Sequence, residues 1–148
     1  LAQLAAYYTP AGLRCERHDQ VLAAIWRKVA FNAALNGICA VTGSTVGQLG
    51  QHPDTRALVH QTSQEVIDVA RAAGVLVDAD GVHHDLDHAM EHHVHHKPSM
   101  LQDLLARRPT EVDAINGQVR AHGERLGVPT PCVSTLHTLV KQMEATAS

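Results

Sequence analysis

An almost uninterrupted apolar stretch, residues 21–41, dominates the hydrophobic pattern of the chain. Its polar side chains are Arg27, Lys28, Asn32 and Asn36. The last three are spaced four residues apart, so on a helix they form one narrow stripe about 12 Å long. A helix that faces solvent normally carries a broad charged face. One cation followed by two amides instead indicates a stripe that faces a ligand or another domain. The spacing alone is equally consistent with a helix edge where two packed layers meet and the amides bond neighbouring backbone.

The rest of the chain also follows a helical period, interrupted by residues that typically start or end helices. We expect the apolar helix to end near Gly37. The pattern predicts further helices over residues 45–50, 54–74, 82–95, 99–108, 110–127 and 132–144. The candidate capping residues are Asp19, Ser44, Asp54 and Thr110 with Asp113 in capping-box-like spacing. Only residues 13–18 alternate enough for a short strand. The sequence therefore predicts an all-α bundle of about seven helices.

Composition narrows the class of protein. The 148 residues suffice for one domain with a core, and no stretch reaches the length of a transmembrane helix. Cys15, Cys39 and Cys132 are widely spaced, which is typical of reduced thiols in a cytoplasmic protein. A net charge of −3 with scattered signs and few aromatic residues argues against nucleic acid as a partner. Because the chain starts at Leu1 in a helical pattern, we expect it to be part of a longer polypeptide.

Four motifs occur in an order and spacing that resemble one known family. They are WRKVAFNAALN (26–36), SMLQD (99–103), TEVDAINGQV (110–119) and GVPTP (127–131). Together they resemble the C-terminal domain of ketopantoate reductase (2-dehydropantoate 2-reductase). That family joins an N-terminal Rossmann domain, which carries NADPH, to an all-helical domain of the 6-phosphogluconate dehydrogenase C-terminal type, which closes over the substrate.

The resemblance implies a domain boundary within this chain. Residues 1–18 correspond to the end of the Rossmann domain and the linker, and residues 19–148 correspond to the helical substrate-binding domain. The nearest glycine run, Gly43, Gly47 and Gly50, lacks the GxGxxG spacing and a preceding strand. We therefore expect the cofactor to be bound mainly by a domain that this chain lacks, and the chain alone to be inactive.

The functional positions of the family correspond to five residues here. The lysine of the W-x-K motif corresponds to Lys28, which the resemblance makes the general acid. Asn32, Asn36 and Ser99 correspond to residues that bind the substrate. Glu111, from the T-E-x-D motif, is implied to lie near both the cofactor and the catalytic lysine. These residue types suit the reaction, because hydride arriving at a 2-keto carbon leaves negative charge on the carbonyl oxygen, which an ammonium can stabilise and protonate.

Structural roles are also open for some of these residues. Ser99 could be only a helix N-cap, and Glu111 could be an acid favoured by the dipole of the first helical turn. We also expect Lys28 to be buried among apolar neighbours. The chain departs from the family near Val46 and at His96, where some members carry asparagine. These departures leave open which 2-keto acid is the substrate.

A histidine-rich segment, residues 83–96, supports a different hypothesis. His84, His88 and His92 repeat every four residues, a spacing at which pairs of imidazoles can bind Zn²⁺ or Ni²⁺. The alternative function is thus a non-catalytic helical module for metal binding or oligomerisation. We favour a solvated helix face and no metal, because the opposite side is apolar, with Val82, Leu86, Met90 and Val94. The sequence as a whole favours an NADPH-dependent 2-keto acid reductase, reducing 2-dehydropantoate to pantoate as a cytoplasmic homodimer with no membrane or nucleic-acid partner.

Overall fold

The computed structural model describes residues 20–147, which form seven α-helices, one π-helix and no strand. The elements are α2 (Val21–Thr42), α3 (Val46–Gly50), α4 (Pro53–Ala72), α5 (Ala79–His92), α6 (Ser99–Leu105), η2 (Asp113–Gly117), α7 (Gln118–Leu126) and α8 (Pro131–Ala147). The prediction of an all-α bundle of about seven helices is confirmed. The predicted strand at residues 13–18 and the predicted cap Asp19 lie outside the described residues.

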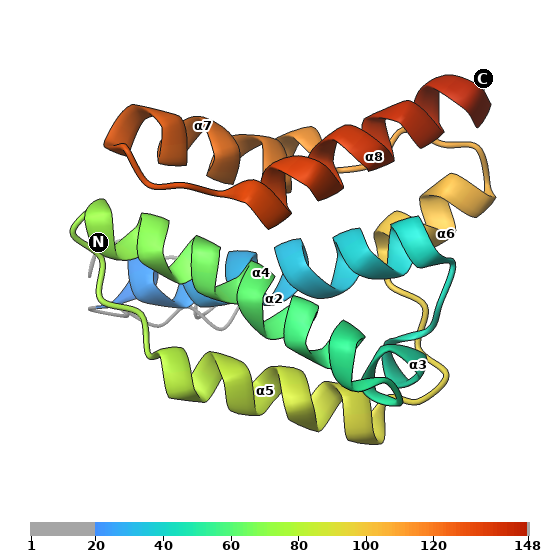
Figure 1. Ribbon diagram of the computed structural model, residues 1–148, viewed down its shortest axis with the longest axis horizontal. Coiled ribbons are helices and arrows are strands. Elements are labelled where there is room, and N and C mark those ends of the chain that lie inside the picture. Colours follow the sequence, from blue (N-terminus) through green and yellow to red (C-terminus); the bar gives the residue numbers. More distant parts are fainter. Residues whose placement is uncertain (1–19, 148) are drawn as a thin grey trace, which may run out of the picture.

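The helices form three layers around α2. Figure 1 shows α2 and α4 in the middle layer, with α7 and α8 on one side and α5 on the other. The two middle helices pack most extensively against each other, and α2 also contacts α5, α6 and α8. The core residues of α2 are mostly alanines, from Ala30 to Ala40, and small side chains allow neighbouring helices to approach closely.

Helix α2 continues past the predicted end at Gly37. It ends at Thr42, and Gly43 supplies the left-handed C-cap with φ 69°. A Cβ built on Gly37 would lie 3.4 Å from Leu136 Cδ1 and 3.5 Å from Asn116 Nδ2. These are ordinary van der Waals distances, and the prediction was wrong because Gly43, not Gly37, has the left-handed backbone that ends the helix.

Two other predicted caps were also wrong. Thr45, not Ser44, caps α3, because its side chain accepts the Gln48 N–H while the Gln48 side chain accepts the Thr45 N–H. Helix α4 begins at Pro53, so Asp54 lies in the first turn, where the helix dipole favours an acid. Both helices therefore begin one residue away from the predicted position.

The glycines of α3 serve helix packing. A Cβ on Gly47 would lie 2.5 Å from Val94 Cα, and one on Gly50 would lie 2.9 Å from Met90 Cβ. Contacts this short to backbone and Cβ atoms leave no room for a larger residue. The Thr45 hydroxyl donates to the Val94 carbonyl at 2.7 Å and fixes the same approach. This arrangement brings α3 against the end of α5, beside the cavity described below.

Candidate active site

A cavity of about 410 Å³ brings three of the five predicted site residues together. Asn32 and Asn36 line it from α2, and Ser99 lines it from the first turn of α6. The remaining lining residues are apolar or imidazole-bearing, apart from one glutamine: Phe31, Leu35, Val46, Ala89, His93, His96, Pro98 and Gln102. The cavity thus has an apolar wall and a short row of hydrogen-bonding groups, which suits a small polar ligand.

Three of the polar side chains that line the cavity are not engaged by the protein, whereas Gln102 Nε2 donates to the Lys97 carbonyl at 2.8 Å. Within residues 20–147, the side chains of Asn32, Asn36 and Ser99 make no hydrogen bond with other residues. Asn36 is buried, and a buried amide without a partner is unfavourable unless it meets solvent or a ligand. Ser99 is not an N-cap: Pro98 holds that position, and no side-chain capping bond is formed. The observed geometry thus favours ligand binding over the structural alternatives for these three residues.

Lys28 lies outside the cavity, on the exposed N-terminal half of α2. It is exposed in this chain, so the expected burial among apolar neighbours was wrong. The same end of α2 exposes Val21, Leu22 and Ile25, and the described residues leave this apolar surface uncovered. Lys28 precedes Asn32 by one helical turn, which places the two Cα atoms about 6 Å apart along the axis. It therefore lies on the same stripe as the cavity amides but beyond their end.

Glu111 is also exposed and outside the cavity. It belongs to the turn that leads into the π-helix η2, and its carbonyl accepts the Ile115 N–H at 3.0 Å. The predicted capping box is absent: the Thr110 hydroxyl accepts the Val112 N–H, and the Thr110 N–H donates to Glu144 on α8. The capping prediction was wrong because a carboxylate 34 residues away satisfies this turn.

The π-helix is attached to α2 beside the cavity. The buried Asn116 donates from Nδ2 to the Ala33 carbonyl at 3.1 Å. Ala33 directly follows Asn32, so this bond relates η2 to the stripe of polar residues. π-Helical turns within α-helices frequently occur at functional sites. The hydrogen bond from Asn116 therefore joins η2, which follows the turn that carries Glu111, to α2.

The histidine-rich segment divides between solvent and the cavity. His88 and His92 are exposed and stacked, with ring centroids 4.2 Å apart. The described residues contain no group of three or more His, Cys, Asp or Glu placed to hold a metal ion, so His84, His88 and His92 do not form such a group. Val82, Leu86 and Met90 are buried as predicted, whereas Val94 is exposed, because α5 ends at His92.

Sequence reasoning missed the contribution of His93 and His96 to the cavity. Both imidazoles line it, next to Pro98 and Ser99. The helical period placed His93 in a helix over residues 82–95, and His96 was noted only as a departure from the family. Helix α5 instead ends at His92, and the His96 carbonyl accepts the Val46 N–H of α3. The one feature of the sequence that could have indicated a role in the cavity is their position just before Pro98 and Ser99.

Burial raises the pKa of both thiols in the described residues, whereas a reactive cysteine needs a lowered pKa. Cys39 is buried in α2, and desolvation raises its pKa to about 12. Cys132 lies at the start of α8, where burial and then the neighbouring Glu65 raise its pKa to about 11. Neither thiol is therefore suited to act as a nucleophile at neutral pH.

The fold and the cavity define an all-α ligand-binding domain, and comparisons with known proteins identify its family. A family described as "Ketopantoate reductase PanE/ApbA C terminal" matches residues 20–144. The chain therefore belongs to the ketopantoate reductases, in the part of them that forms the C-terminal domain. Both the family and the all-α class were expected from the four motifs, and both are confirmed.

Individual relatives agree with this assignment. The chain is 34% identical to a 2-dehydropantoate 2-reductase of Streptococcus pyogenes over 97% of its own length and 47% of the relative. It superposes with a TM-score of 0.88 on a PanE/ApbA family ketopantoate reductase from Ralstonia eutropha, at 33% identity, covering 99% of this chain and 49% of that one. A D-mandelate dehydrogenase in complex with NADH gives a TM-score of 0.90 at 30% identity, covering 99% and 50%.

Two further findings concern the length of the chain relative to its relatives and its helices. It spans about half the length of the curated relatives it matches. Among its described helices, none is both long enough and apolar enough to cross a membrane.

Proposed function

We propose that this chain is the substrate-binding part of an NADPH-dependent 2-keto acid reductase that reduces 2-dehydropantoate to pantoate. The observation that carries the proposal is the cavity, which gathers Asn32, Asn36 and Ser99 with their hydrogen-bonding groups free. Family membership favours this function over a metal-binding or oligomerisation module. The proposed domain division is the predicted one, with residues 1–18 ending the nucleotide-binding domain and residues 19–148 forming the helical domain.

The proposed roles follow from chemistry and position. The two amides and the Ser99 hydroxyl orient the oxygens of the keto acid without adding a charge beside the lysine. Lys28 stabilises the developing oxyanion and donates a proton from Nζ to it. Glu111 lies near the lysine and the cofactor. The reduced nicotinamide, when bound, supplies the hydride.

A cofactor-bearing domain fits the uncovered end of α2. Val21, Leu22 and Ile25 are all exposed there, next to Lys28. An adjoining domain that covered this apolar surface would remove water from around Lys28 and bring the nicotinamide to the end of the polar stripe. NADPH instead of NADH is part of the proposal.

The decisive experiment replaces Lys28. In the polypeptide that joins this chain to its nucleotide-binding half, Lys28→Ala is expected to lower kcat for 2-dehydropantoate reduction at least about 10²-fold, because a general acid contributes about that much. The reaction is followed by the loss of NADPH absorbance. Arg71→Ala, which removes an exposed cation from α4, is the matched control. Near-normal turnover in the Lys28 variant would remove this residue from the mechanism.

The amides are tested by binding. Asn32→Ala and Asn36→Ala are expected to raise KM for the keto acid more than they lower kcat, since the amides bind the substrate in both the ground state and the transition state. Unchanged KM in both variants would return the stripe to a structural role.

The assembly and compartment remain proposals of the same kind. We propose a homodimer in the cytoplasm, and the free thiols of Cys39 and Cys132 support the compartment. Light scattering at micromolar concentration tests the assembly, and a monomer would contradict it.

A further inference from the structure

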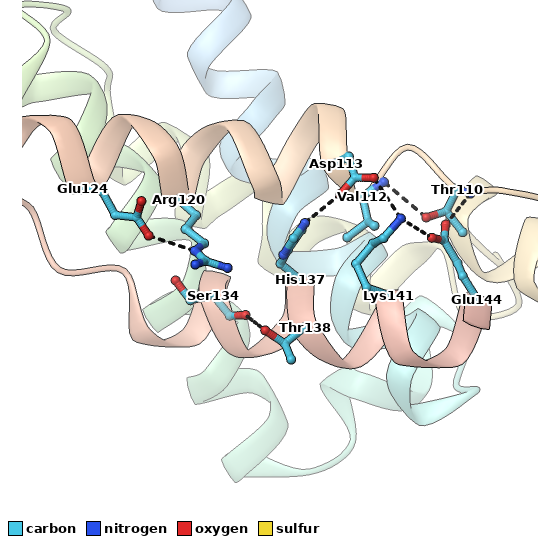
Figure 2. Close-up of polar contacts among 10 residues, drawn as sticks. All are labelled: Thr110, Val112, Asp113, Arg120, Glu124, Ser134, His137, Thr138, Lys141 and Glu144. Atoms are coloured by element: carbon cyan, nitrogen blue, oxygen red, sulfur yellow. Dashed lines mark hydrogen bonds and ion pairs between the residues drawn. The ribbon is translucent and has the colours of Figure 1, made fainter. Parts of the chain in front are cut away.

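One face of α8 holds the turn that carries Glu111. His137, Lys141 and Glu144 follow one another at helical spacing and point toward residues 110–113, as Figure 2 shows. No part of the proposed mechanism uses these three side chains.

The contacts reach both ends of the turn. Glu144 Oε1 accepts the Thr110 N–H at 2.7 Å, and Glu144 Oε2 lies 2.7 Å from Lys141 Nζ. The same ammonium lies 2.9 Å from Asp113 Oδ2, and His137 Nε2 lies 2.8 Å from Asp113 Oδ1. Lys141 therefore links the carboxylate that holds the start of the turn to the carboxylate at its end (Figure 2).

Electrostatics keeps this network charged at neutral pH. Hydrogen bonds from Lys141 and then His137 lower the pKa of Asp113. Burial by itself would raise the pKa of Glu144, but the bonds from Lys141 and Thr110 outweigh it, and the pKa is lowered. Bonding to Glu144 and then Asp113 raises the pKa of Lys141 well above its usual range. All three groups thus carry full charges across the neutral range.

Within the turn, Glu111 is exposed and its side chain makes no hydrogen bond or ion pair with the other described residues. Thr110 and Asp113 are held by α8, and Val112 between them is fully buried against Met100 and Val140. These contacts hold the residues on both sides of Glu111, and its own carbonyl accepts the Ile115 N–H.

The ion pair between Asp113 and Lys141 contributes little to stability. The Asp113 and Lys141 side chains are 65% and 43% exposed, and ion pairs this exposed are weak in water. A geometric role is therefore the better explanation for three bonds that converge on one short turn.

We propose that Lys141, together with Glu144 and Asp113, is a positioning residue that holds Glu111 at the active site. This inference rests on the proposed function, in which Glu111 acts beside Lys28 and the cofactor. A group displaced by about 1 Å can lose about 10²-fold in rate, so a loosened turn lowers kcat without removing any group that touches the substrate.

The test compares Lys141→Met with two reference variants in the polypeptide that includes the nucleotide-binding half. Lys141→Arg preserves both ion pairs and is the conservative rescue. Glu124→Gln breaks the exposed ion pair of α7 between Arg120 Nε and Glu124 Oε1, which lie 2.9 Å apart, and leaves residues 110–113 untouched (Figure 2). kcat, KM, the melting temperature and amide exchange over 110–113 are measured for each.

The expected result is a loss of kcat confined to Lys141→Met. We expect kcat to fall about 10-fold with KM changed less than about 2-fold, because the lost positioning acts on the transition state. The melting temperature is expected to match that of Glu124→Gln, while exchange of the Thr110 amide becomes faster. Lys141→Arg is expected to keep most of the activity.

A double-mutant cycle with Glu111→Gln separates the inference from the proposed function. If Lys141 acts through Glu111, Lys141→Met causes no further loss of kcat in the Glu111→Gln background. Suppose that Glu111→Gln lowers kcat. The positioning role is then overturned, and the proposed function stands, if Lys141→Met has no more effect than Glu124→Gln. The same holds if the loss of kcat in Lys141→Met multiplies fully with that of Glu111→Gln in the double variant. If Glu111→Gln retains full kcat, the role of Glu111 in the proposed function fails, and the positioning role fails with it.

Discussion

A buried carboxylate at the start of α8 allows the stability of the bundle to be predicted quantitatively. Glu65 lies on α4 with 8% exposure. Its Oε1 accepts the Cys132 N–H and its Oε2 accepts the Val133 N–H, both at 2.9 Å. Because Pro131 has no N–H, these are the first two amides of α8. One side chain thus caps a helix 67 residues further along the chain and joins α4 to α8.

Replacing Glu65 by alanine leaves both amides without an acceptor. An unpaired buried donor costs about 1–3 kcal/mol, and loss of a helix cap alone costs about 0.5–2 kcal/mol. Relief of the buried charge offsets part of this loss. We expect Glu65→Ala to reduce the free energy of unfolding by about 3 kcal/mol, equivalent to about 6–12 °C in melting temperature for a domain of this size. Glu65→Gln keeps one carbonyl acceptor, and we expect about half that loss.

Urea unfolding followed by far-ultraviolet circular dichroism measures both variants. Glu124→Ala is the control, because its carboxylate is exposed and its loss should change the free energy by less than about 0.5 kcal/mol. The reasoning is refuted if Glu65→Ala is no more destabilising than the control. If Glu65→Ala and Glu65→Gln lose the same free energy of unfolding, a single carbonyl acceptor does not stabilise the start of α8, and both carboxylate oxygens are needed.

The remaining predictions concern the packing of α3, the thiols and one histidine. Gly47→Ala should cost about 1–3 kcal/mol and raise KM for the keto acid, since its Cβ would lie 2.5 Å from Val94 Cα; unfolding curves and kinetics check this. With pKa values of about 12 and about 11, Cys39 and Cys132 should react with iodoacetamide at pH 8 at least about 10²-fold more slowly than a free thiol, as counted by mass spectrometry. Burial and then a neighbouring histidine lower the pKa of His83, so the unfolded chain binds this proton more readily than the folded one. Stability should therefore fall as the pH drops below about 6.5, and unfolding of His83→Leu should show a weaker pH dependence.

The elements that could be predicted are those specified by local pattern. The apolar period located the helices, and the four-residue spacing placed Asn32 and Asn36 on one face of α2. Both line the cavity, although the spacing alone was equally consistent with a helix edge between packed layers. Ser99 was identified by its motif and lies there too. These predictions succeeded because a helix fixes the relation of residues four apart whatever packs around it.

The features that could not be predicted depend on residues distant in sequence. Gly37 has the local signature of a helix end, but α2 continues through it to Thr42 while packed against α4, α6 and α8. Thr110 has the signature of a cap, but Glu144 satisfies its amide from α8. In both cases a tertiary contact overrides a weak local preference, and no short-range pattern reports that contact.

The position of Lys28 outside the cavity follows from how α2 is divided. Its C-terminal half is enclosed by the other helices and places Asn36 at the cavity, whereas its N-terminal half is exposed and carries Lys28. Hydride transfer requires the substrate to be enclosed, and a lysine in water is a poor match for that task. In the proposed function, the helical domain by itself would offer its keto-acid site at one end of the stripe and leave the proposed acid solvated at the other. Closure of the proposed nucleotide-binding domain over Val21, Leu22 and Ile25 would join the two halves, so the division of α2 couples cofactor binding to assembly of the active site.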